Sequence, residues 1–104
     1  MFGKNKTQDP DGEFFTVFDT KSQSYTEPFP APNSAVLMRD FTTAFRHPDA
    51  PQKNRYFQNA EDFQIFKCGK FSLKTGLIES QQLEHVANCH DLKAMALGDA
   101  RPGH

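Results

Sequence analysis

The sequence predicts an α+β fold, in which two β-hairpins form a small antiparallel sheet and one helix packs across a face of that sheet. Residues 13–19 and 63–71 are rich in aromatic and β-branched side chains, which is typical of strands. Residues 34–47, which lie between them, place apolar side chains at helical spacing. The order hairpin, helix, hairpin therefore indicates a sheet layer covered by a helix layer.

Chain length and aromatic content determine what the core can be. A chain of 104 residues has the size of one domain, and it can bury about two-thirds of the surface that it exposes when unfolded. Hydrophobic residues make up only 37%, but eleven Phe and two Tyr are among them. Each of these rings can bury roughly 150–250 Å². We therefore expect a core that is built mainly from aromatic rings.

Three segments differ in composition. Residues 1–12 are polar and contain Asp-Pro and Asp-Gly, which are turn signals, so we expect a loose arm. Residues 13–80 contain the expected strands and helix and form the core domain. Residues 81–104 are expected to form a C-terminal helix or extension, followed by a tail that begins at Gly98.

The first hairpin is expected to consist of a strand over residues 13–19, a turn over 21–24 and a return strand over 25–29. Prolines follow closely in the return segment and just beyond it, at positions 28, 30 and 32. Proline cannot donate a hydrogen bond to a neighbouring strand, so this segment is expected to be an edge strand or an extended arm.

The helix is expected to begin at Asn33 or Ser34, where a side-chain oxygen can cap the first free amides. His47-Pro48 ends it, because the residue before a proline avoids helical geometry. Residues 48–60 are rich in turn-forming residues and are expected to be a long connection. The apolar face of the helix consists of Leu37, Phe41, Ala44 and Phe45.

The second hairpin is expected to run from the strand 63–71, through a turn over 72–76, to a return strand over 77–79. Gly76 can take the left-handed conformation that such a turn needs. After it, the spacing of Leu83, Val86 and Ala87 permits a second helix over residues 81–97. Residues 88–90 interrupt that pattern.

Composition argues against several classes of protein. The net charge of -1 gives no general attraction to polyanions, although residues 39–74 carry seven Lys or Arg and four acids. Two cysteines do not make the disulfide framework of a small secreted domain, and no apolar signal segment is visible. The longest apolar run, residues 35–38, is too short to cross a bilayer. We therefore expect a protein of a reducing cytoplasm without a membrane partner.

No catalytic or metal site is recognisable, and no cofactor is expected. His85 and Cys89 lie four residues apart on the permitted helix, but they supply only half of the ligands that a structural zinc takes. Glu61 and Asp62 are adjacent at the start of a strand, so they would point to opposite faces and could not share a proton. Nothing near Cys68 supports a Cys–His pair.

Aromatic and basic residues make single-stranded nucleic acid the first candidate ligand, because bases stack on rings while cations follow the backbone. Rings alternate to both faces of the expected sheet, and one helix can cover only one face. The other face must be covered by residues 81–97, by a second copy or by a ligand. The candidate nucleic-acid-binding residues are Arg39, Lys53, Arg55, Tyr56, Phe57, Lys67, Lys70, Phe14 and Phe66.

Two alternatives remain open for these rings. Phe14 and Phe66 can belong to the core or to a dimer interface, since aromatic residues at strand spacing are usually packed. Phe57 can anchor the connection 48–60 instead of meeting a base.

An ordered set of motifs resembles a known family. The matching residues are Phe15, Val17, Phe18, Asp19 and Lys21, then Pro28 and Phe29, then Ala35, Val36, Arg39 and Phe41, then Glu61, Asp62, Phe63, Ile65, Phe66, Gly69, Phe71, Thr75 and Gly76. This set resembles the small nonstructural protein of gokushovirus-type microviruses. Ser72 stands where that family has Asp, and the tail after Ser80 does not match closely. The resemblance implies a bacteriophage protein of the host cytoplasm that handles a single-stranded DNA genome.

Two functions follow from the residues and the resemblance together. The first is a non-enzymatic phage protein that self-associates, as a homodimer or higher homo-oligomer, and binds single-stranded DNA without sequence preference. The second is an adaptor for capsid assembly or host interaction. It would bind a phage or host protein through an aromatic sheet face and the proline-rich segment 28–32. Oligonucleotide binding that falls steeply with salt would favour the first.

Overall fold

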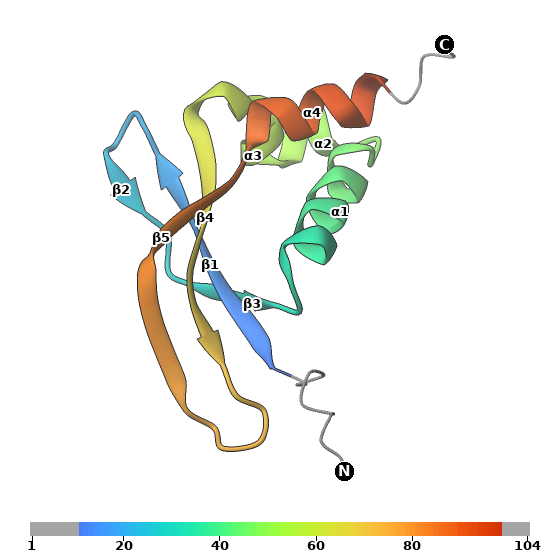
Figure 1. Ribbon diagram of the computed structural model, residues 1–104. Helices are drawn as coiled ribbons and strands as arrows, with labels where there is room; N and C mark the ends of the chain where they lie inside the picture. The colour runs from blue at the N-terminus through green and yellow to red at the C-terminus, as the bar shows by residue number, and fades with distance from the viewer. Residues whose placement is uncertain (1–10, 99–104) are drawn as a thin grey trace.

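A computed structural model describes residues 11–98, which form the expected α+β fold, an antiparallel sheet with helices on one face (Figure 1). The strands are β1 (Gly12–Asp19), β2 (Ser24–Tyr25), β3 (Phe29–Ala31), β4 (Phe63–Phe71) and β5 (Ile78–Asn88). The helices are α1 (Ser34–Phe45), α2 (Ala50–Lys53), α3 (Arg55–Gln58), the 3-10 turn η2 (Ala60–Asp62) and α4 (Cys89–Gly98). The expected arm and tail fall largely on residues 1–10 and 99–104, which lie outside the described residues.

The strands pair in the order β2–β1–β4–β5, and β3 pairs with β1 on the same side as β2. The first hairpin thus differs from the expected strand 25–29, because two short strands take the place of one. Thr26 continues the contact with β1, since its amide donates to the Val17 carbonyl at 2.9 Å and its hydroxyl accepts from the Val17 amide at 3.0 Å. Pro28 has no amide hydrogen with which to extend the ladder toward β3.

Helix α1 begins and ends close to the expected positions. The side-chain oxygen of Asn33 accepts the Val36 amide at 2.9 Å, so Asn33 is the N-cap. The helix ends at Phe45, three residues before Pro48. Leu37 and Phe45 are buried in the core beneath the helix.

The connection 48–60 is more ordered than the sequence predicts. It contains α2 and α3 and ends at the first residue of η2, and a proline lies in the first turn of α2, where the missing amide hydrogen costs nothing. Asn54 caps α3, because its side-chain oxygen accepts the amides of Tyr56 and Phe57 at 2.9 and 3.2 Å. Phe57 is buried, so this segment is held on the core by its own side chain.

The C-terminal prediction is wrong in its boundary between strand and helix. Residues 81–88 belong to β5, and α4 starts only at Cys89. A β-bulge explains the misleading spacing. In the register with β4, Ile65 faces Ala87 and Phe66 faces His85, so Val86 is an extra residue and packs toward the core next to Ala87. Two adjacent residues that both pack toward the core, the partly buried Val86 and the buried Ala87, resemble the apolar spacing of a helix.

The second hairpin turn is confirmed. Gly76 has a φ of 78°, in the left-handed region that favours glycine, and its amide donates to the Ser72 carbonyl at 2.8 Å. The hairpin formed by β4 and β5 extends away from the helices (Figure 1).

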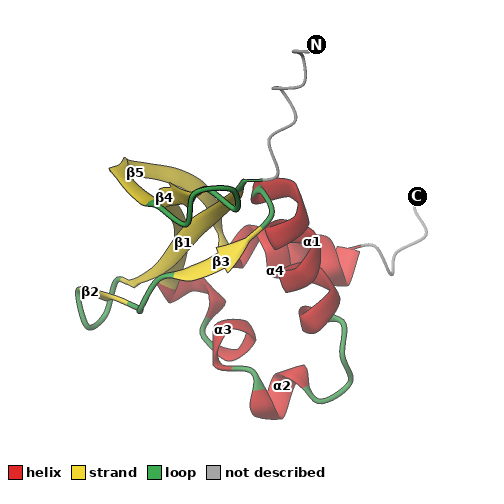
Figure 2. Cartoon of the chain, turned by 90° about the horizontal axis from the view of Figure 1, so that it is seen from below, coloured by secondary structure: helices red, strands yellow, loops and turns green. Residues whose placement is uncertain are grey.

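All the helices lie on one side of the sheet, and α4 packs against α1 rather than across the opposite face (Figure 2). The expected alternation along the central strands is confirmed, since Phe15, Val17 and Ile65 are fully buried beneath the helices. We call the opposite side the open face; it carries Phe14, Phe18, Tyr25, Phe66, Phe71 and His85. Residues 81–97 therefore do not cover it.

Replacing the N-cap, Asn33→Ala, is expected to lower the free energy of unfolding by about 1 kcal/mol, because the Val36 amide loses its acceptor. Asn59→Ala is the matched control, since the Asn59 side chain caps nothing at the start of η2. Urea denaturation followed by circular dichroism measures both. Equal losses in the two variants would contradict the capping role.

Candidate nucleic-acid interface

An open pocket of about 570 Å³ lies between the C-terminal end of α1 and the short helices α2 and α3. We call it the basic pocket, because it collects three of the residues predicted to bind nucleic acid, Lys53, Arg55 and Tyr56. Its complete lining is Ala44, His47, Asp49, Ala50, Lys53, Asn54, Arg55 and Tyr56. The α3 cap at Asn54 holds Arg55 and Tyr56 in place on this rim.

Arg55 is an exposed cation that lies over aromatic rings. Its guanidinium carbon lies 5.1 Å from the ring centroid of Tyr56 and 5.4 Å from that of Phe63. It also acts on the end of β1. The pKa of Asp19 lies below its usual value, first because the carboxylate accepts the Lys21 amide, and in smaller part because of the positive charge of Arg55. Arg55 is thus oriented by rings and still open to solvent.

Lys53 and His47 provide two further donors. The Lys53 ammonium lies 3.8 Å from an Asp49 carboxylate oxygen, with 77% of the lysine side chain exposed. Such an exposed pair is weak, so the ammonium can exchange the carboxylate for a phosphate. His47 accepts the Asp49 amide at Nδ1, at 3.0 Å, and the neutral ring therefore carries its proton on Nε2. Both groups can donate to an anion.

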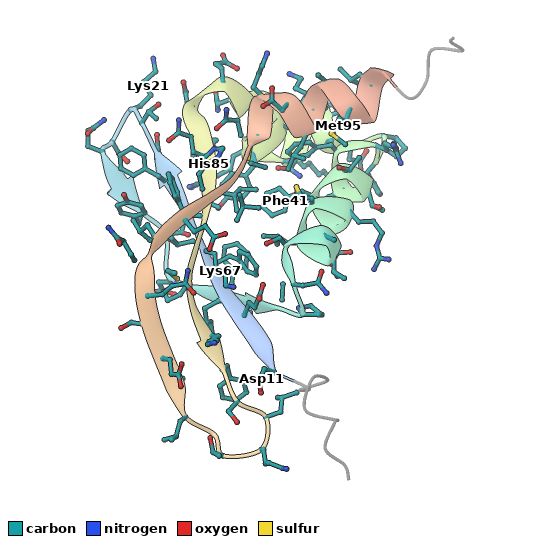
Figure 3. All side chains as sticks on the ribbon, viewed as in Figure 1. Asp11, Lys21, Phe41, Lys67, His85 and Met95 are labelled. Carbon is teal, nitrogen blue, oxygen red and sulfur yellow. The ribbon has the colours of Figure 1, made fainter. Side chains whose placement is uncertain are left out.

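Tyr56 separates the basic pocket from a neighbouring apolar groove of about 400 Å³. Its half-buried ring contacts Phe63 at 4.9 Å and Phe41 at 5.8 Å between centroids. Phe41 lies between α1 and the sheet (Figure 3). The groove is lined by Phe29, Pro30, Ala31, Pro32, Leu37, Asp40, Phe41, Ala44, Asn54 and Tyr56. Cations and rings thus stand side by side along one surface.

Phe57 does not belong to this surface. Only 8% of it is exposed, and the Lys93 ammonium lies 4.3 Å from the centroid of its ring. A buried ring cannot stack on a base, so the stacking role predicted for Phe57 is corrected to that of an anchor. Arg39 is exposed on α1 beside Asp40, at 3.9 Å, and does not line the basic pocket.

The two predicted lysines of β4 lie apart from the basic pocket. Lys67, near the middle of the sheet, forms an ion pair with Glu13 at 2.9 Å, in which only 19% of the lysine side chain is exposed (Figure 3). Its charge is therefore balanced within the fold. Lys70 is exposed, but its neighbours across the two adjacent strands are Glu13 and Glu79.

Phe14 and Phe66 lie on the open face, where rings contact one another. The centroid of Phe14 is 6.0 Å from that of Phe71, and the centroid of Phe66 is 6.2 Å from that of Tyr25. The predicted binding residues thus divide between two surfaces, one basic and one aromatic. The sequence did not predict that His47 and Asn54 line the pocket, because His47 stands where the helix was expected to end and Asn54 lies in a stretch of turn-forming residues.

The described residues contain neither an activated thiol nor a metal cluster. Burial raises the pKa of the Cys89 thiol to about 12, and it raises the pKa of Cys68 as well. His85 lies in β5 and Cys89 in α4, so the helical spacing considered for a zinc pair does not exist. No group of three or more His, Cys, Asp or Glu in residues 11–98 could hold a metal ion. Over the same range, no helix is long and apolar enough to cross a membrane.

Comparison with protein families gives one match. Residues 12–92, more than three quarters of the 104-residue chain, match the family described as "Phage ORF5 protein". The match spans the whole sheet, the basic pocket and the first turn of α4. Comparison with curated proteins and with solved structures gives no match.

A thiol reagent at pH 8 is expected to modify one cysteine per native chain, Cys68, because the buried Cys89 thiol stays protonated at that pH. Cys68→Ser should abolish the native reaction, and Cys89→Ser should leave it intact. Absorbance of the released chromophore counts the thiols. Two equally fast thiols in the native wild type would contradict the burial of Cys89.

Proposed function

The chain belongs to the phage ORF5 protein family, and we propose that it binds single-stranded DNA without sequence preference, as a non-enzymatic nonstructural protein. The basic pocket is the observation that carries this proposal, since Lys53, Arg55 and Tyr56 meet there. The protein would act in the host cytoplasm during viral genome synthesis or during the transfer of the genome to packaging. The resemblance to gokushovirus-type microviruses supports the single-stranded form of the ligand.

The pocket has the size and the groups for one nucleotide of a strand. A volume of about 570 Å³ falls in the range of small-ligand sites. A backbone phosphate would meet the Lys53 ammonium and the Nε2 donor of His47. The base would stack on the guanidinium plane of Arg55 or on the Tyr56 ring, and neighbouring nucleotides would continue into the apolar groove.

The expected lack of sequence preference follows from the kind of contact. Phosphate contacts position a strand but do not identify its bases, and every base has a face that can stack. We propose no bond-making step at this site, because the pocket offers cations, an aromatic ring and an exposed Asp49–Lys53 pair, which are groups suited to holding a ligand.

We also propose that the protein self-associates, because the rings of the open face lack cover from residues 11–98. An adaptor for capsid assembly or host interaction is the second candidate function. It is favoured by the same uncharged face and by Pro30, which is exposed on the edge strand β3. Absence of oligonucleotide binding at low salt would leave the adaptor as the better proposal.

The double variant Lys53→Ala, Arg55→Ala is expected to weaken binding of a labelled oligonucleotide to the same extent for all sequences. The slope of log K against log salt should fall by about 0.7, which corresponds to the one phosphate contact of Lys53 on a single strand, while the loss of Arg55 removes a stacking partner of the base. Fluorescence anisotropy at several salt concentrations measures this. Lys21→Ala, Lys74→Ala is the control with the same change of charge on residues outside the pocket. Equal effects of the two double variants would remove the pocket from the site.

Tyr56→Leu is expected to cost about 1–3 kcal/mol of binding free energy, because leucine keeps an apolar side chain beside Phe41 and Phe63 but offers no face for stacking. Tyr56→Phe should bind like the wild type. The comparison uses the same anisotropy assay, with the denaturation midpoint of each variant as the check on folding. Unchanged affinity in a folded Tyr56→Leu would exclude stacking on this residue.

A further inference from the structure

The open face carries apolar surface that is exposed to solvent. Tyr25 is 49% exposed and contacts the rings of Phe18, at 4.6 Å, and Phe66, at 6.2 Å. Ile78 is 65% exposed and faces Phe71 across the hairpin, which places it on the same side. Leu83 is 43% exposed, and alternation along β5 places it beside His85 on this face.

The chemistry of this face does not suit a polyanion. The side chains that β1 and β4 direct to it, such as Thr16, Gln64 and Phe66, carry no charge. Lys67, the nearest lysine in the sequence to Phe66, lies on the other side of the sheet and is paired with Glu13. An occupant must therefore present apolar surface of its own, since rings without cations give no attraction to phosphates.

The size of the face is sufficient for a second copy of the chain. Strands spaced by about 4.8 Å, with eight residues in β1, give four strands a footprint on the order of 500 Å². Two copies would bury roughly 1,000 Å² in total, which is the lower limit for a specific interface. An antiparallel sheet face can pack on a copy of itself, because two sheets pack face to face with interdigitating side chains.

We propose that the open face packs against the open face of a second copy, related by a two-fold axis. This inference rests on the self-association in the proposed function and names the surface for it. A small, mostly apolar cavity of about 290 Å³ receives a side chain from the partner; its lining is Phe14, Pro28, Cys68, Gly69, Ile78, Glu79 and Ser80. We expect an interface at the lower size limit to be weak, so that the dimer dissociates on dilution.

Sedimentation velocity over a dilution series tests the dimer, at high salt and without DNA. The wild type should dissociate on dilution, whereas Ile78→Lys, Leu83→Lys should be monomeric at every concentration, because both side chains are exposed and would place lysines inside the interface. Met95→Lys, Leu97→Lys is the control; these side chains are 55% and 53% exposed on α4, and Met95 lies on the helix side (Figure 3). It should dimerise like the wild type.

Cys68 gives an independent readout, because it lines the cavity that the partner would close, while Cys89 is buried and silent. Its rate of modification should fall as the wild-type concentration rises and should be independent of concentration in Ile78→Lys, Leu83→Lys. A wild type that is monomeric throughout, or a double variant that still dimerises, would overturn the proposal. Protection of Cys68 by an oligonucleotide in the monomer would also overturn it, because the face would then bind bases.

The dimer and the DNA-binding function fail separately. A monomer that still binds oligonucleotide through Lys53 and Arg55 would remove only the proposed interface. A dimer that does not bind oligonucleotide at low salt would remove the DNA-binding function and leave the interface in place.

Discussion

The antiparallel pairing of β1 with β4 is the constraint on which the rest of the structure depends. These strands lie at the centre of the sheet, so their alternate side chains supply both of its surfaces. Phe15, Val17 and Ile65 form the floor of the core beneath the helices. The residues between them are thereby directed to the other side, whether or not anything covers them there. Strand alternation thus produces the core and the open face in a single step.

The core beneath the helices also positions the basic pocket, although it does so indirectly, through Phe57. Phe57 packs into the core and Asn54 caps the helix that carries it, so Arg55 and Tyr56 are set on a segment that is fixed at both ends. Lys93 adds a third restraint, since its ammonium donates to the Phe57 carbonyl at 3.2 Å. Packing, and not a long helix, therefore holds Arg55 and Tyr56 in place. A defined binding surface requires side chains that are held in this way.

Features that depend on strong local signals could be predicted from the sequence, whereas features that depend on tertiary contacts could not. The cap at Asn33 and the left-handed Gly76 could be predicted, because each depends on the chemistry of a few neighbouring residues. The bulge at Val86 could not, because only the register against β4 makes two adjacent side chains point inward. The burial of Phe57 could not be predicted either, because in the sequence a ring that stacks on a base and a ring that packs into the core look the same beside Lys53 and Arg55. Placing His47 in the pocket required the fold itself.

The direct passage of β5 into α4, from Asn88 to Cys89, has a consequence for how chain length can vary. With no spacer between them, one inserted residue would turn the helix by about 100°. Leu92 and Ala96, now sealed inside, would rotate toward water. The tip of the β4–β5 hairpin has no such coupling to the helices. Insertions and deletions in related chains should therefore be found at that tip and be absent from the junction between β5 and α4.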